Sequence, residues 1–332
     1  MVLCYHKKGL YTPPEVNIAM AETPLSKSVP LTAEQQYDAQ VKVLLANKEI
    51  LAWIMKDCVE EYKNCSVEDI AYKYIEGTPE IDTPVDREDA APNIQGLSNE
   101  DTTAAEGKVL YDIRFNAIAP DDEGQYIKLI INIEAQQKDD PGYSLTRRGI
   151  YYCSRMLSAE KNVEFVKSDY NRLKKVYSIW ICYSSTKAPN TMVRFKMAKE
   201  ELVGHVNVNP KEYDLLQVIM LRLGDPEEAG AKSALRMLDY IFTNEIAIEQ
   251  RKQALEGEYD LAMTEKVREE MNQMCNVSQG ILEQGIQKGI QKGLEKGLKE
   301  TAFRLQKMGT SLPMIAAIIN TPESTVAEWL RQ

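Results

Sequence analysis

The sequence predicts an α/β protein that continues into a helical C-terminal region. Two segments near the middle of the chain, 109–119 and 126–137, alternate between apolar and polar residues, which is the periodicity of half-buried strands. A short apolar run at 176–183 predicts a further, buried strand. Apolar residues at helical spacing precede these segments, and from about Ala229 the chain has helical character to its end.

Composition narrows the class of protein. The 332 residues suggest two or three domains, and 44% hydrophobic with 27% charged residues is typical of a globular chain. There is no run of about 18 apolar residues and no apolar stretch after residues 1–10, so we expect no membrane span, no secretory signal and a cytoplasmic location. The six cysteines form no CxxC pair and indicate a reducing compartment.

The histidine content and the net charge argue against a histidine-based site and against non-specific DNA binding. The only two histidines, His6 and His205, are far apart, which disfavours a histidine-based zinc site or catalytic triad. The net charge of −10 opposes non-specific attraction to DNA phosphates. DNA binding by this chain would therefore require a local basic face.

The chain divides into four predicted parts. Prolines and weak periodicity in 1–31 predict an extended arm. Residues 32–225 would form the main domain, in which Thr32 begins a helix whose apolar residues recur up to Tyr62, and 77–106 is a long acidic loop. Residues 226–300 would be a helical region. Residues 301–332 would be a small helical tail, in which Gly309 ends one helix and Thr321-Pro322 starts the next.

A predicted hairpin places acidic side chains on one face of the sheet. Turn residues 120–124 separate its two strands. On the second strand Glu134 and Gln136 share the face opposite an apolar set that includes Ile131, and Asp112 lies on the polar face of the first strand, next to core-facing Ile113. A register in which paired residue numbers sum evenly, with a loop such as 121–125, sets Asp112 opposite Glu134 at ~5 Å.

Two carboxylates at that separation repel each other unless a cation joins them. A hard divalent ion such as Mg²⁺ or Mn²⁺ suits oxygen ligands, and it would lower the pKa of a bound water and stabilise charge on a scissile phosphate. The alternative is that both acids are solvated on the polar face. The helix predicted over 143–158 carries Arg148, Tyr152 and Arg155 on a stripe that either faces the same cleft or forms a surface ion-pair face.

These residues resemble a known family. The segments LYDIRFNA, IKLIINIEAQ, PGYSLTRRGIYYCSRML and YNRLKKVYSIWIC are similar to the PD-(D/E)XK nuclease superfamily, and within it to the transposase-like recombination-promoting nucleases. The upstream segment with Asp38 and Lys42 resembles the family's opening helix. The likeness is close over residues 32–200 and looser over 280–330.

The resemblance implies an αβββαβ restriction-endonuclease-like core and metal-dependent DNA cleavage. It makes Asp112 the first acid of the motif and Glu134 the second, and it puts Gln136 at the position of the motif's lysine. Glutamine orients a water molecule through hydrogen bonds but supplies no positive charge. The source of a third metal-side carboxylate is left open among Glu60, Glu61, Glu100 and Asp101.

Residues 280–298 contain an internal repeat. Glycines at 285, 289, 293 and 297 are each followed by Ile or Leu. Glycine costs a helix about 1 kcal/mol relative to alanine, so we expect a compensating contact and predict an oligomerisation helix, with a partly helical linker as the alternative. The tail has few cations, which favours a packing cap over a DNA-binding helix-turn-helix.

The function expected from these features is divalent-metal-dependent endonucleolytic cleavage of DNA, linked to recombination or mobile elements. DNA and a second copy of the chain would be its partners. The alternative is a catalytically inactive, oligomeric DNA- or protein-binding protein on the same fold.

Overall fold

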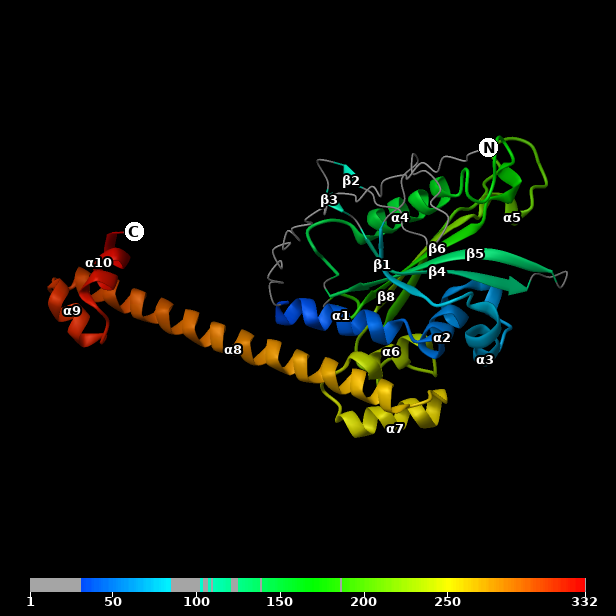
Figure 1. Ribbon diagram of the computed structural model, residues 1–332. Helices are drawn as coiled ribbons and strands as arrows, with labels where there is room; N and C mark the ends of the chain where they lie inside the picture. The colour runs from blue at the N-terminus through cyan, green and yellow to red at the C-terminus, as the bar shows by residue number, and fades with distance from the viewer. Residues whose placement is uncertain are drawn as a thin grey trace, which may run out of the picture.

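The computed structural model describes residues 31–84, 102–103, 107–108, 110–120, 125–137, 139–185 and 187–331 (Figure 1). Apart from Leu31, the predicted arm lies outside these residues, as does most of the predicted acidic loop 77–106. The helices described are α1 (Ala33–Leu45), α2 (Lys48–Cys58), η1 (Glu60–Tyr62), α3 (Val67–Asp69), η2 (Ile70–Tyr74), α4 (Leu145–Ala159), η3 (Tyr170–Arg172), α5 (Pro210–Tyr213), α6 (Ala234–Phe242), α7 (Ile248–Tyr259), α8 (Glu265–Lys307), α9 (Leu312–Ile318) and α10 (Glu323–Arg331).

The strands form one mixed sheet and a short separate ribbon. They are β1 (Glu80–Pro84), β2 (Thr102–Thr103), β3 (Gly107–Lys108), β4 (Leu110–Pro120), β5 (Tyr126–Gln136), β6 (Lys175–Cys182), β7 (Thr191–Lys196) and β8 (Leu216–Arg222). Over the described residues, the larger sheet has the order β1-β4-β5-β6-β8-β7, and β2 pairs with β3. β5, β6 and β8 run parallel, whereas β1, β4 and β7 run antiparallel to their neighbours. The predicted α/β class and helical C-terminal region are confirmed.

The β4–β5 hairpin has the predicted register. Pairing runs from Ile113 opposite Ile133 to Pro120 opposite Tyr126. Continued by one residue, this register sets Asp112 opposite Glu134. Ile113 and Ile131 are fully buried in the same core, as predicted.

Helices cover both faces of the sheet (Figure 1). α4 lies on one face, while α1, α2, α6 and α7 pack on the other. α4 approaches the sheet closely at Gly149, where an added Cβ would lie 2.6 Å from a methyl group of Val218. β5 is consequently buried on both faces from Leu129 to Glu134. The prediction of a half-buried strand was wrong here, because α4 also covers the face that carries the polar residues.

The first predicted helix is divided in two. The hydroxyl of Thr32 accepts a hydrogen bond from the Gln35 backbone N–H, and Gln35 bonds back to Thr32, so the predicted start is confirmed. At Asn47 a second cap forms, because its side chain accepts the backbone N–H of Glu49 at 2.9 Å. This cap starts α2 as a separate helix, which the apolar spacing did not reveal.

Two edge strands were not predicted. β1 falls within the predicted acidic loop, and β7 falls in a segment without clear alternation. Both lie at the ends of the strand order, and β7 is mostly exposed. An edge strand that is exposed does not need the alternation that marks a half-buried one.

The C-terminal helices divide between two cores. α6, α7 and the first part of α8 belong to the core beneath the sheet, which therefore runs across the predicted boundary near residue 225. Residues 282–297 of α8 are all exposed and lead to a separate small core of α9, α10 and the end of α8 (Figure 1). Across the described ranges, no helix combines the length and apolar content needed to cross a bilayer.

Candidate active site

Asp112 and Glu134 meet where the β4–β5 pairing stops. The backbone N–H of Asp112 donates to Oε1 of Glu134 at 3.2 Å, and the N–H of Ala135 donates to Oδ2 of Asp112 at 2.9 Å. Side-chain oxygens therefore replace the backbone ladder beyond Ile113 and Ile133. The two carboxylates predicted from the alternation of both strands are brought together at this point.

The regular alternation of β4 is broken at Asp112. Tyr111 packs in the core beneath α4, whereas Ile113 packs in the core on the α1 side. In an unbroken strand, residues two apart share a face. The break places Asp112 between the two layers of helices.

Lys42 of α1 supplies a cation to this pair. Its Nζ lies 3.1 Å from Oδ1 of Asp112 and 2.8 Å from Oδ2 of Asp38, and its side chain is only 11% exposed. Burial raises the pKa of Asp112, and the charge of Lys42 opposes that rise. A buried charge destabilises the fold unless an opposite charge lies next to it. Removing either Lys42 or Asp112 would therefore leave the other as an unpaired buried charge.

Glu134 is the more deeply buried acid. Its side chain is nearly inaccessible, and burial followed by the nearby charge of Asp112 raises the pKa of Glu134 well above its usual value. Arg148 and Asn132 oppose this rise without cancelling it. Burial and the neighbouring Asp112 therefore disfavour ionisation of Glu134, and an added cation would favour ionisation of both acids.

Two of the three predicted α4 residues border the pair. Arg148 donates from Nε and Nη2 to the hydroxyl of Tyr152 at 3.1 and 2.6 Å, and its guanidinium lies over the Trp180 ring at 5.3 Å. These contacts hold the guanidinium close enough to lower the pKa of Glu134. Arg155 is half-buried two turns further along α4, about 10 Å along the helix axis from Arg148.

Gln136 follows the pair on β5. Its side chain is half-buried, and its backbone oxygen accepts a hydrogen bond from the N–H of Tyr183 at 3.1 Å. Burial, together with the nearby charges of Asp38 and Asp112, raises the pKa of Tyr183. Gln136 and Tyr183 therefore supply neutral polar groups at the carboxyl end of β5, next to Asp112.

Two of the four candidates for a third carboxylate, Glu60 and Glu61, lie away from this site. Glu60 lies at the other end of the sheet, where it pairs with Arg194 at 2.6 Å and Lys196 at 3.2 Å. The short helix η1 that carries it packs against the start of β6, so that candidate was wrong, and Glu61 lies with it. Glu100 and Asp101 lie outside the described residues. Among the side chains the structure describes, no three His, Cys, Asp or Glu residues gather as a metal-binding group.

Sequence reasoning did not assign Lys42 to the site. Apart from the resemblance of its segment to the family's opening helix, the signal was a lysine inside the apolar stripe of the first helix, next to Val41 and close to Leu44. A charged residue on a stripe that faces the core needs a buried partner. That requirement would have directed the search to Asp112.

Comparison with known proteins gives no matching family model, no matching curated protein and no matching solved structure.

Proposed function

We propose that this protein is a divalent-metal-dependent DNA endonuclease linked to recombination or mobile elements. The observation that carries the proposal is the buried pair of Asp112 and Glu134 at the end of the β4–β5 hairpin, with Lys42 on one side and Arg148 on the other. A buried pair of like-charged carboxylates is costly for folding alone. Paired acids with perturbed pKa values are typical of catalytic sites.

The order of elements supports the family that the sequence resembles. Leaving aside the short elements η1, α3, η2, β2, β3 and η3, α2 is followed by β1, β4 and β5, and then by α4 and β6. This is the order helix, three strands, helix, strand implied by the PD-(D/E)XK resemblance. Asp112 and Glu134 lie on the second and third of those strands.

The residues fit a hard cation such as Mg²⁺ or Mn²⁺. Asp112 and Glu134 would hold it, and Mg²⁺ commonly uses only one or two protein carboxylates together with waters and substrate phosphates. When bound, the ion would lower the pKa of a water and neutralise charge developing on a phosphate. The raised pKa values of both acids show that burial makes their ionisation unfavourable, and a bound cation would offset that free energy.

Other residues of the chain would orient the water, supply positive charge and contact the DNA. Gln136 would orient the attacking water through its amide, and Lys42 would provide the positive charge that glutamine lacks. Arg148, held by Tyr152, would contact a phosphate of the DNA as a planar donor. Since the net charge of the chain is −10, contacts of this kind would have to supply the local attraction to DNA.

A non-catalytic DNA- or protein-binding role is the second candidate. It is favoured because both oxygens of Asp112 already have partners, Lys42 on Oδ1 and the Ala135 N–H on Oδ2. In that case the ion pair would hold α1 against the hairpin and would have no chemical role.

Plasmid nicking distinguishes the two candidates. The wild-type chain should nick supercoiled DNA with Mg²⁺ or Mn²⁺ and not with EDTA, and Asp112→Asn should reduce the rate at least a hundredfold, since removing a group that stabilises the transition state costs about that much. Asp140→Asn makes the same chemical change at an exposed acid paired with Lys187, and it should nick like wild type. Nicking that survives in Asp112→Asn, or never occurs in the folded wild type, would support the binding role instead.

We also propose that α8 pairs with α8 of a second copy. The exposed row Leu282, Ile286, Ile290 and Leu294 recurs every fourth residue, and each of these side chains is more than half exposed. The glycines at 285, 289, 293 and 297 form a parallel groove with open space above them. The apolar ridge of each copy would fit the glycine groove of the other, and such packing of four-residue rows gives a crossing angle near about −50°.

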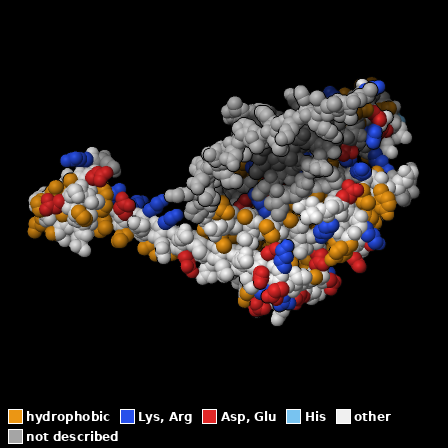
Figure 2. All heavy atoms as spheres, viewed as in Figure 1, with side chains coloured by type: hydrophobic (Ala, Val, Ile, Leu, Met, Phe, Trp, Pro, Cys, Tyr) orange, Lys and Arg blue, Asp and Glu red, His pale blue; other side chains and the backbone are white. Residues whose placement is uncertain are grey.

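Charge along α8 favours an antiparallel arrangement of the two copies. Residues 265–286 carry four glutamates and two cations, whereas residues 287–307 carry six cations and two glutamates. Lys and Arg side chains gather along this second half of the helix in Figure 2. An antiparallel pair would place the acidic half of each helix next to the basic half of the other.

A further inference from the structure

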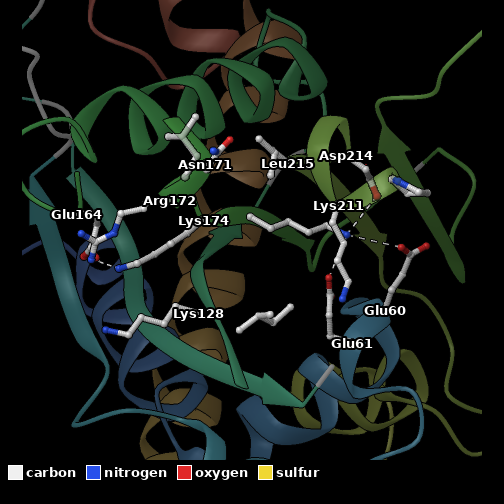
Figure 3. Close-up of a pocket in the computed structure, with 14 residues that line it drawn as sticks. Glu60, Glu61, Lys128, Glu164, Asn171, Arg172, Lys174, Lys211, Asp214 and Leu215 are labelled. Carbon is white, nitrogen blue, oxygen red and sulfur yellow. Dashed lines mark hydrogen bonds and ion pairs between the residues drawn. The ribbon is translucent and has the colours of Figure 1, made fainter. Parts of the chain in front are cut away.

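A cavity lies at the opposite end of the parallel strands from Asp112 and Glu134 (Figure 3). It has a volume of about 500 Å³. Its walls come from the starts of β5, β6 and β8 and from η1, η3 and α5. Lys175 in this cavity pairs with Leu129, five residues before Glu134 on β5, which is about 16 Å along a strand. The cavity is therefore distinct from the candidate active site.

One side of the cavity is a neutralised network of charges. Nζ of Lys175 lies 3.1 Å from Glu61 and 3.2 Å from Asp214, and the hydroxyl of Tyr177 donates to Glu61 at 2.5 Å. Glu60 joins the network 3.7 Å from Lys175. Burial would raise the pKa of Glu60, but hydrogen bonds from its neighbours lower it overall. This side therefore presents carboxylate oxygens that their partners already fix in place.

An acceptor on this side still lacks a donor. Asp214 is buried, and its Oδ1 has no hydrogen-bond partner among the described residues. Burying an acceptor without a partner is costly. Because Oδ1 of Asp214 is itself buried, the hydroxyl or amino donors of a ligand would instead meet the more exposed carboxylate of Glu60.

The opposite side carries cations. Figure 3 shows Arg172, Lys174 and Lys128 across the cavity from Glu60, Glu61 and Asp214. Lys174 is paired with Glu164, but Lys128 and Arg172 are exposed, and no described residue pairs with either. Two cations at one side, one of them an arginine, suit a doubly charged phosphate.

Apolar side chains lie between the two charged sides. Ile127, Leu173 and Leu215 line this part of the cavity. A ligand here therefore needs an anionic end, a body with apolar faces and a donor end. The volume lies in the range of about 300–1,000 Å³ that is usual for small-molecule sites.

We propose that this cavity binds a phosphorylated small molecule of mononucleotide size, with the phosphate on Lys128 and Arg172 and donor groups on the carboxylate side. A polynucleotide strand passing through would bring further phosphates next to Glu60, Glu61 and Asp214, whose carboxylate oxygens accept hydrogen bonds and donate none to a phosphate. The ligand is accordingly a free small molecule rather than a segment of DNA. This proposal goes beyond the nuclease function and does not depend on it.

Calorimetric titration of the full-length protein tests the proposal with the four ribonucleoside 5′-monophosphates, adenosine and inorganic phosphate as probes. At least one mononucleotide should bind saturably at one site per chain, and adenosine and phosphate should each bind at least tenfold more weakly. The Lys128→Gln/Arg172→Gln variant should lose at least tenfold in affinity for that mononucleotide. Lys161→Gln/Lys167→Gln removes the same charge from exposed lysines outside the cavity and should bind normally.

Three outcomes would overturn the proposal. The first is the absence of saturable binding by any mononucleotide, and the second is equal affinity in the two double variants. The third is a single-stranded oligonucleotide that binds more tightly than the mononucleotide and is weakened by the same cavity substitutions. Asp112→Asn should retain full mononucleotide affinity, so failure of this proposal and failure of the nuclease proposal are distinguishable.

Discussion

At the scale of single residues, burial sets the chemistry of several acids. Asp112 and Glu134 are held in contact while their pKa values rise, and Lys42 limits that rise for Asp112. Glu160, at the end of α4, is a third buried acid. Its Oε2 accepts the backbone N–H of Lys174 at 2.8 Å, and its Oε1 has no hydrogen-bond partner in the described part of the chain. Burial raises the pKa of Glu160 to about 7.

The raised pKa of Glu160 predicts a pH dependence of stability. Between its usual value of 4.5 and about 7, the folded protein keeps the proton that the unfolded chain releases. The free energy of unfolding should therefore fall as pH rises through this window, by at most about 3 kcal/mol from this group. Glu160→Gln should match wild type near pH 4.5 and be more stable at pH 8. Urea unfolding at both pH values measures the difference, and parallel pH profiles would contradict the assignment.

At the scale of elements, α8 is unusual in its length and in its glycine content. It is a 43-residue helix whose exposed middle carries a glycine at every fourth position. Because glycine has a low helix propensity, this segment would have little stability as an isolated helix. The ends of α8 are held by the two cores, which leaves the middle to be stabilised by a partner.

The glycine row gives a test in which two effects have opposite signs. A side chain at Gly289 or Gly293 would meet no atom of the same chain within 4 Å. Gly289→Leu/Gly293→Leu should therefore favour the isolated helix by up to about 2 kcal/mol from propensity while weakening assembly through the glycine groove. Light scattering should show a dimer or larger species for wild type and mainly monomer for the variant.

Replacement of exposed polar residues on the same helix, Gln287→Leu/Gln291→Leu, controls for added leucine. That variant should assemble like wild type. A monomeric wild type, or a glycine variant that assembles more tightly, would leave α8 as a linker between the two cores.

At the scale of the whole molecule, the candidate active site joins both layers of helices to the sheet. Lys42 comes from α1, Arg148 comes from α4, and the carboxylates come from β4 and β5. A ligand bound at such a point stabilises the fold as a whole, because unfolding of either layer disrupts its site.

Divalent cations should therefore raise the melting temperature. At one hundred times the dissociation constant, linkage adds about 2.7 kcal/mol, or roughly 5–10 °C for a core of this size. Asp112→Asn should remove most of the shift, and Asp140→Asn should keep it. Scanning calorimetry with and without Mn²⁺ measures both. Equal shifts in all three proteins would mean that the ion binds elsewhere.

The sequence by itself determined the hairpin and its pair of acids. Alternation along 109–119 and 126–137 is a local property, and it predicted the two strands and, once the two acids were taken to share a face, the parity of the register that brings Asp112 to Glu134. The starts of α1 and α10 and the end of α8 near Gly309 were likewise predictable. Caps and turns depend on side chains only a few residues apart.

Tertiary structure decided what surrounds those acids. Lys42 reaches Asp112 only because α1 packs across the hairpin, and Glu134 is buried only because α4 covers the second face of β5. The cavity around Lys175 and Arg172 likewise joins segments from η1 to β8 that no local pattern connects. Periodicity specifies which face of an element is apolar, but the partner on that face depends on how the whole chain packs.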